Sequence, residues 1–196
     1  MIKLLLIATL MMPQQPTILR RLFPPKIARD TTVNLIVIHY DSGNSSNIVI
    51  RYLRQTHKSY HYYIERSGRI IQLVNPTQVA GHAGVSRWGT LSSLNFSSIG
   101  ICLQNIPPQS YTDAQYVSLV FLAGQLQHRW PDITVDKIVG HEDVAYPRGR
   151  KHDPGKKFDW ARFRAALDTT QFKPMKKVVK PTPKHRKSLA KRPKKG

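Results

Sequence analysis

One short run of residues limits the folds open to this chain more than any other feature. Residues 33–39 read Val-Asn-Leu-Ile-Val-Ile-His, an almost continuous stretch of apolar, mostly β-branched side chains. A strand that is apolar on both faces is typical of the interior of a sheet that is covered on both sides. The run therefore predicts a central strand with protein packed above and below its sheet.

Strand and helix patterns intermix along the rest of the middle of the chain. The dipeptide Ser67-Gly68 lies between two apolar runs, which favours a hairpin, and Thr112 to Gln115 fits a capping box at the start of a helix. Predicted strands lie at 60–65, 69–74, 98–103 and 133–139, and predicted helices at 47–57, 112–130 and 159–167. We therefore expect one α/β domain, with helices layered on a central sheet.

The charge of the chain is concentrated at its C-terminal end. The formal net charge is +20, from 31 Lys and Arg against 11 Asp and Glu. Residues 172–196 contain 11 Lys and Arg and no acid, so the rest of the chain carries only +9. Prolines and the lack of a regular apolar period predict a disordered basic tail at 171–196. The tail is either a solvated extension or a contact for a polyanion, such as anionic lipid, a wall polymer or nucleic acid.

The N-terminal end also differs from the core. One lysine, Lys3, precedes the mostly apolar residues 4–12, which resembles the first two parts of a secretory signal. Pro13 follows directly, without a clear cleavage site. We interpret 1–12 as a signal-like segment, 13–30 as a linker and 31–170 as the domain. We then expect a periplasmic, secreted or other cell-envelope location, with the cytoplasm as the alternative.

Two histidines and one aspartate form a candidate metal site. His39 and His141 each end an apolar run, and Asp153 follows in a loop. Two imidazoles and one carboxylate would give zinc three protein ligands and leave a fourth position for water, as in catalytic sites. The lone Cys102 excludes a cysteine-rich zinc site. Spacing alone leaves open that these are ordinary hydrogen-bonded histidines at the rim of a sheet.

Six short motifs in order make the metal site more specific. They are Ile36-Val-Ile-His-Tyr40, Ser59-Tyr-His-Tyr-Tyr-Ile64, Gly81-His-Ala-Gly84, Ser98-Ile-Gly-Ile-Cys-Leu103, Val139-Gly-His-Glu-Asp143 and Lys151-His-Asp-Pro-Gly155. Together they resemble the zinc-dependent N-acetylmuramoyl-L-alanine amidases of the second amidase family, which are related to peptidoglycan recognition proteins and a phage lysozyme. The resemblance covers about residues 33–167. It implies a mixed central sheet flanked by helices, with His39, His141 and Asp153 as ligands of Zn²⁺.

The resemblance implies hydrolysis of the amide between N-acetylmuramic acid and L-alanine in peptidoglycan or muropeptides. Zinc makes this feasible near neutral pH by activating water and polarising the carbonyl. The anion that develops on the carbonyl oxygen needs a cation or donor nearby. Lys151 matches a lysine that the family uses there, so we expect it to stabilise that anion. A solvated lysine in a basic loop is the alternative.

One motif departs from the family pattern at Cys102. Many wall-recycling members have Glu there, whereas a thiol with a pKa of about 8.5 is mostly protonated at neutral pH. The phage-lysozyme branch also has Cys, together with a Tyr elsewhere in the site, and Tyr60 holds the matching position. We therefore expect Cys102 to pack in the core and Tyr60 to hydrogen-bond water or substrate. A purely structural Tyr60 stays open.

Three further residues are candidates for substrate binding. His82 lies in a motif that lines the substrate groove of the family, and Arg87 and Trp88 follow in a loop that could meet sugar or peptide. We expect a monomer that binds peptidoglycan or muropeptides. The alternatives are a wall-binding protein without activity and a polyanion-binding protein that acts through its tail.

Overall fold

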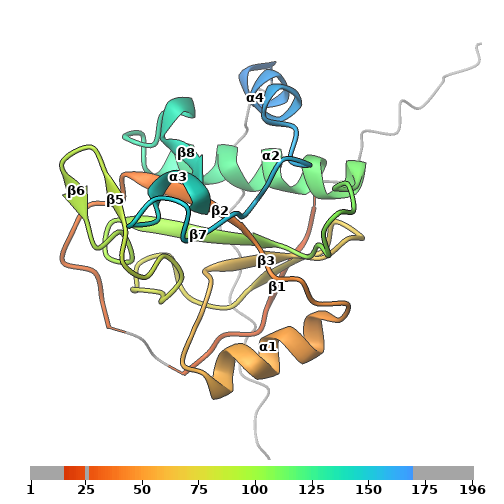
Figure 1. Ribbon diagram of the computed structural model, residues 1–196, viewed down its shortest axis with the longest axis horizontal. Coiled ribbons are helices and arrows are strands. Elements are labelled where there is room, and N and C mark those ends of the chain that lie inside the picture. The colour runs from red at the N-terminus through yellow and green to blue at the C-terminus, as the bar shows by residue number, and fades with distance from the viewer. Residues whose placement is uncertain (1–15, 25–26, 170–196) are drawn as a thin grey trace, which may run out of the picture.

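The computed structural model describes residues 16–24 and 27–169. Within them a six-stranded sheet has the order β1-β4-β3-β7-β2-β8 (Figure 1). Its strands are β1 (Ile18–Arg20), β2 (Leu35–Tyr40), β3 (Tyr62–Ile64), β4 (Ile70–Gln72), β7 (Ser98–Leu103) and β8 (Ile138–Gly140). All pairings are parallel except that of β3 with β4, so the sheet is mixed, as predicted.

Helices cover both faces of this sheet. They are α1 (Ser46–Gln55), α2 (Asp113–Arg129), α3 (His141–Val144) and α4 (Trp160–Thr169), with a 3₁₀ turn at Val135–Lys137 and a small hairpin of β5 (Arg87–Trp88) and β6 (Leu91–Ser92). In Figure 1, α2 and α4 lie on one side of the sheet and α1 lies on the other. We call these sides the α2 face and the α1 face.

The α2 face is a continuous apolar core. Because side chains alternate along a strand, Ile36 and Ile38 of β2 point to this face, as do Ile99 and Ile101 of β7. Helix α2 packs its own buried residues, including Leu119, on these strands. The predicted capping box is present, since Thr112 Oγ1 accepts from Gln115 N at 3.1 Å. This face therefore supplies most of the apolar burial.

The α1 face has two smaller apolar clusters instead of one. Helix α1 packs Val49 and Leu53 against Tyr63 of β3 and Cys102 of β7. The second cluster joins Leu35 and Val37 of β2 to Ala83, Leu94, Val139 and Val144, with Trp88 and Leu91 of the small hairpin at its edge. A space is left between the two clusters, above the C-terminal ends of β2 and β7.

The structure corrects two expectations about the elements. Residues 133–139 are not one strand, because the polar residues Asp136 and Lys137 lie in the exposed 3₁₀ turn and only Ile138–Gly140 pairs with β2. His141 begins α3 rather than ending a strand. Residues 13–30 are not simply a linker either. Ile18–Arg20 forms an edge strand on β4, and the guanidinium of Arg29 donates to Pro76 O at 2.8 Å and Ser98 O at 2.7 Å.

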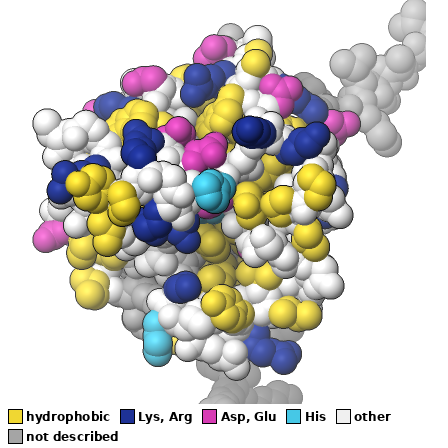
Figure 2. Space-filling model, viewed as in Figure 1, with side chains coloured by type: hydrophobic (Ala, Val, Ile, Leu, Met, Phe, Trp, Pro, Cys, Tyr) yellow, Lys and Arg dark blue, Asp and Glu magenta, His cyan; other side chains and the backbone are white. Residues whose placement is uncertain are grey.

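The predictions for both ends of the chain fall outside the described residues. Segments 1–12 and 171–196 are among the residues that are not described, so the signal-like segment and the disordered tail stay predictions. In the part of the chain that is described, no helix has the length and apolar character needed to cross a membrane. On the face drawn in Figure 2, Lys and Arg side chains are interspersed with acidic and hydrophobic ones.

Candidate functional site

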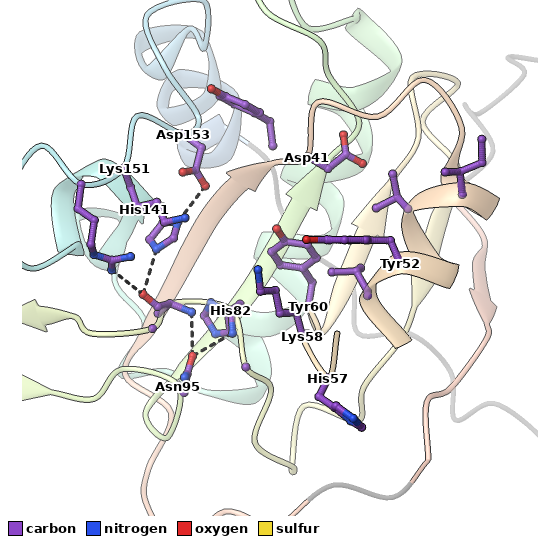
Figure 3. A pocket seen from close by; sticks show the side chains of 18 residues that line it. Asp41, Tyr52, His57, Lys58, Tyr60, His82, Asn95, His141, Lys151 and Asp153 are labelled. Atoms are coloured by element: carbon purple, nitrogen blue, oxygen red, sulfur yellow. Dashed lines mark hydrogen bonds and ion pairs between the residues drawn. The ribbon is translucent and has the colours of Figure 1, made fainter. Parts of the chain in front are cut away.

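A cavity of about 750 Å³ opens between the two clusters of the α1 face. Ile48 and Tyr52 of α1 line one wall, and Gly84 and Arg150 line the opposite one. His141 and Asp153 also line it (Figure 3). This volume is within the range of about 300–1,000 Å³ that is typical of ligand pockets.

Three predicted ligands converge at one point, and two of them, His141 and Asp153, line this cavity. His39 Nδ1 lies 2.9 Å from Asp153 Oδ2, His141 Nδ1 lies 3.0 Å from the same oxygen, and the two Nδ1 atoms are 3.2 Å apart. All three side chains are buried. The three donor atoms come from three separate segments and face one point. A metal ion or a shared proton would hold such an arrangement together.

Strand register explains why the two histidines meet. Strands β2 and β8 are parallel neighbours, and Ile38 is the register partner of Gly140. The next residues, His39 and His141, therefore leave the same edge of the sheet side by side. Gly140 also lets the loop that carries the aspartate approach closely, because a Cβ there would lie 2.7 Å from Pro154 Cδ.

Burial and hydrogen bonds shift the pKa values of His39 and Asp153. Burial lowers the pKa of His39 to about 4, although Asp153 acts in the opposite direction, so this imidazole is neutral at pH 7. Burial alone would raise the pKa of Asp153, but hydrogen bonds from His141 and His39 lower it well below its usual range. His141 Nε2 donates to Ala83 O at 3.0 Å, which leaves the lone pair of a neutral ring on Nδ1, the atom that faces the aspartate.

These donors fit a zinc ion. Tetrahedral zinc holds nitrogen and oxygen ligands at about 2.0–2.1 Å, which separates the ligand atoms by about 3.3 Å. The three donor–donor distances of 2.9–3.2 Å are close to that value. Two neutral imidazoles and one carboxylate are also a donor set that zinc uses, and three protein ligands leave a fourth position. His39, His141 and Asp153 would hold the ion.

His82 lies beneath His39 rather than free in the cavity. His82 Nδ1 is 3.0 Å from His39 Nε2, and His82 Nε2 is 3.3 Å from Ser98 Oγ, which donates to Leu94 O at 2.5 Å. If Nδ1 of His39 keeps its lone pair for a metal, its Nε2–H donates to His82 Nδ1. Both nitrogens of His82 are then occupied. The ring of His82 lines the cavity, but neither of its nitrogens is free to bind substrate, so its role in substrate binding stays a prediction.

Three residues that the sequence analysis did not single out hold this arrangement. Gly100 makes room for His82, since a Cβ on it would lie 2.5 Å from the ring. Asn95 Oδ1 accepts from the backbone N–H groups of His82 and Ala83 at 3.0 and 2.8 Å. Ser98 and Gly100 stand at alternate positions of a strand that is otherwise apolar. That alternation is the sequence signal that could have identified Ser98 and Gly100.

Tyr60 and Lys151 both line the cavity. The ring of Tyr60 lies 5.0 Å from the ring of His39, between centroids, and its hydroxyl contacts the thiol of Cys102. Burial raises the pKa values of Tyr60 and Cys102, so both stay protonated at neutral pH. Cys102 is fully buried in the α1 cluster, as expected. Lys151 forms no ion pair with a described carboxylate.

Arg87 and Trp88 lie in the β5–β6 hairpin, outside the residues that line the cavity. The guanidinium of Arg87 lies over the ring of Tyr146 at 4.3 Å, and Trp88 packs against the second cluster. Each side chain thus has a structural contact. Their assignment to substrate binding stays a prediction that the cavity does not support.

Comparisons with known proteins agree with this geometry. A model of the N-acetylmuramoyl-L-alanine amidase family matches residues 29–156. The 1,6-anhydro-N-acetylmuramyl-L-alanine amidase AmpD of Haemophilus influenzae is 45% identical over 113 residues, which are 58% of this chain and 60% of that protein. The amidase AmiD of Escherichia coli is 33% identical over 147 residues, or 67% of this chain and 52% of the relative.

Solved structures show the same likeness. A selenomethionine derivative of AmpD aligns with a TM-score of 0.66 and 33% identity, covering 76% of this chain and 93% of that one. A complex of E. coli AmiD with anhydro-N-acetylmuramic acid-L-Ala-D-γ-Glu-L-Lys aligns with a TM-score of 0.63 and 30% identity, covering 72% and 60%. The chain spans about 60% of the length of the AmpD relatives that it matches.

The same relatives overturn the expected location. We predicted a periplasmic or secreted protein from the signal-like residues 1–12, and this prediction is wrong, because the matching AmpD amidases are cytoplasmic enzymes. A lysine followed by a short apolar run, without a cleavage site, is a pattern too common to indicate export.

Family membership rests on two independent observations. The family model covers well over half of the chain, and the predicted ligand residues from three distant segments meet at one point of the fold. The chain therefore belongs to the N-acetylmuramoyl-L-alanine amidase family, the second amidase family.

Proposed function

We propose that this protein is a zinc-dependent N-acetylmuramoyl-L-alanine amidase that cleaves the amide between N-acetylmuramic acid and L-alanine. The observation that carries the proposal is the buried triangle of His39, His141 and Asp153, two of whose members line an open cavity. A purely structural triangle would have no reason to face a cavity large enough for a ligand. The presence of Lys151 and Tyr60 on the cavity lining supports chemistry rather than binding alone.

The residues around the triangle have separable roles. When bound, zinc would polarise the scissile carbonyl and lower the pKa of water to about 7. Lys151 supplies a positive charge that stabilises the anion developing on the carbonyl oxygen more than it stabilises the neutral amide. Tyr60, protonated because of its burial, donates a hydrogen bond to substrate or water but does not accept a proton. The buried thiol of Cys102 is likewise no base.

We propose muropeptides with a 1,6-anhydro sugar as the substrate class. AmpD relatives carry this substrate in their names, and the AmiD complex and a Pseudomonas aeruginosa AmpDh3 complex contain anhydromuramic peptides. Both polar and apolar side chains line the cavity, which suits a sugar–peptide junction.

A chelator assay on the purified protein tests this proposal. The zinc-loaded chain is incubated with anhydro-N-acetylmuramyl-L-Ala-D-γ-Glu-L-Lys, and release of the free tripeptide is followed by chromatography. We expect release that a chelator abolishes and added zinc restores. Binding without release would instead favour a non-catalytic wall-binding protein, the reading that Cys102 keeps open.

A lysine variant separates chemistry from metal binding. Lys151→Ala should keep one zinc per chain, because the lysine is not a ligand. Its rate of hydrolysis should nevertheless fall by about 100-fold or more. Lys157→Ala, an exposed lysine outside the cavity, serves as the matched control. An unchanged rate in Lys151→Ala would remove this residue from the mechanism.

A further inference from the structure

The cavity contains one positive charge that the proposed reaction does not use. Three described basic residues line it: Lys58, Arg150 and Lys151. The guanidinium of Arg150 donates to the carbonyl oxygens of Tyr146, Ala83 and Val85, so it holds the loops of one wall together. Lys151 is assigned to the developing anion. Lys58 remains without a role.

Lys58 is an exposed residue on the lining of the cavity. It lies between α1 and β3, two residues before Tyr60, and Figure 3 shows its amine directed into the cavity between Tyr60 and His82. Its Nζ lies 5.9 Å from the ring centroid of Tyr52, also on the cavity wall. Among the described residues, no carboxylate forms an ion pair with it. An unpaired ammonium group on the wall of a cavity favours an anionic ligand group.

The proposed substrate carries a suitable anion close to the bond that is cut. In the ligand of the AmiD complex, L-Ala is followed by D-γ-Glu, a glutamate linked through its side-chain carboxyl group. Its α-carboxylate is therefore free and ionised at pH 7. That group lies one residue beyond L-Ala, at about 7 Å from the scissile amide by the length of two extended residues. Lys58 lines the same cavity as His141 and Asp153, so one bound stem peptide can reach both its amine and the ligand residues.

We propose that Lys58 binds the α-carboxylate of the γ-linked D-glutamate and makes the protein selective for stem peptides that carry it. This inference rests on the proposed function, because it identifies part of the substrate of the same site. The contact lies away from the metal ligands and contributes binding rather than chemistry. A stem peptide in which this carboxylate is an amide loses the charge that Lys58 recognises.

Paired substrates test the proposal directly. The kcat/KM is measured for anhydro-N-acetylmuramyl-L-Ala-D-γ-Glu-L-Lys and for its α-carboxamide analogue, which differs by one charge. We expect the unmodified protein to prefer the carboxylate by about tenfold, the gain typical of a charge-assisted hydrogen bond. Lys58→Met should bring the ratio of the two values to about one, and Lys58→Arg should keep most of the preference.

A charge control removes long-range electrostatics from the result. Arg51→Gln removes one positive charge from exposed α1 outside the cavity lining, so it should leave the ratio unchanged. The proposal is overturned if Lys58→Met keeps the preference, if Arg51→Gln abolishes it equally, or if the unmodified protein has none. If neither substrate is cleaved, the proposed function fails separately. The ratio of the two dissociation constants, measured by calorimetry on the zinc-loaded protein, then supports or overturns the role of Lys58 in the same way.

Discussion

The two faces of the central sheet are built from the same strands but on different principles. On the α2 face, Ile36 and Ile38 pack only through apolar contacts with the side chains around them. On the α1 face, the alternate residue His39 has a defined partner at each ring nitrogen. Apolar packing is non-directional and tolerates small changes, whereas a buried polar group depends on each of its hydrogen bonds.

The difference separates stability from activity along one strand. Substitutions on the α2 face should change how firmly the chain folds and leave the site intact in the folded molecules. Substitutions on the α1 face should change metal binding or chemistry more than they change folding. The expectations below test this separation, beginning with the largest effect.

Removing a ligand should have the largest effect. Asp153→Ala deletes one of three donors and leaves two neutral histidines, so zinc affinity should fall by more than the 10- to 100-fold that loss of an outer hydrogen-bond partner costs. Activity should be lost with the metal. Zinc content after dialysis and a competition titration measure this, and circular dichroism monitors the fold. A variant that retains one zinc per chain would show that Asp153 is not a ligand.

A large cavity on the opposite face should spare the site. Leu119 is fully buried in α2, so Leu119→Ala should lower the free energy of unfolding by about 2–5 kcal/mol. The zinc affinity of the folded protein should stay within about twofold, because no ligand contacts this helix. Urea unfolding and the same zinc titration give both numbers. A tenfold loss of zinc affinity at a temperature where the variant is folded would break the separation of the two faces.

The support beneath His39 should matter less than a ligand itself. His82→Ala removes the acceptor for His39 Nε2 and should lower zinc affinity by about 10- to 100-fold. His82→Asn offers an oxygen near the position of Nδ1 and should recover part of the affinity. Equal losses in both variants would indicate that His82 only fills space above Gly100.

Acid should weaken the metal-free protein through the α1 face. Burial lowers the pKa of His61 from 6.5 to about 3, so between these values the unfolded chain binds a proton that the folded chain does not. The free energy of unfolding therefore falls as pH drops below 6.5, by up to about 1.4 kcal/mol per pH unit for this residue.

Variants assign this pH dependence to one residue. In urea titrations between pH 7 and pH 5, His61→Asn should reduce the slope by the share of His61 and leave the shares of the buried His39 and His82. His128→Gln, at an exposed position of α2, should leave the slope unchanged. An unchanged slope in His61→Asn would mean that this histidine is not neutral in the folded state.

The smallest effect is expected at Cys102. Its thiol is fully buried and its pKa is raised by that burial, so it cannot act as a base. Cys102→Ala should change kcat by no more than about twofold, measured in the tripeptide-release assay at pH 7 with zinc content as the control. A large loss of rate at full zinc occupancy would give the thiol a part in the reaction.

Much of the fold could be predicted because its signals are local. The apolar run at 33–39 required a doubly covered central strand, and the capping box at Thr112 marked the start of α2. Both depend on short stretches of sequence whose periodicity and end groups are visible without the rest of the molecule. The short edge strand β1 and the 3₁₀ turn at 135–137 were missed. Each has only three residues, too few for an apolar period to be recognised, and β1 forms by pairing with β4, which is distant in sequence.

The sequence by itself determined which residues could form a metal site. Its six motifs also determined the resemblance to the amidase family. Only the tertiary structure decided that His82 contacts His39, that Arg87 and Trp88 lie outside the residues lining the cavity, and that Lys58 is among them. The physical reason is that the ability of a side chain to bind a metal depends on its own chemical groups, which the sequence gives directly. The direction of a side chain depends instead on strand register, on the room left by Gly100 and on the packing of two clusters around a common space.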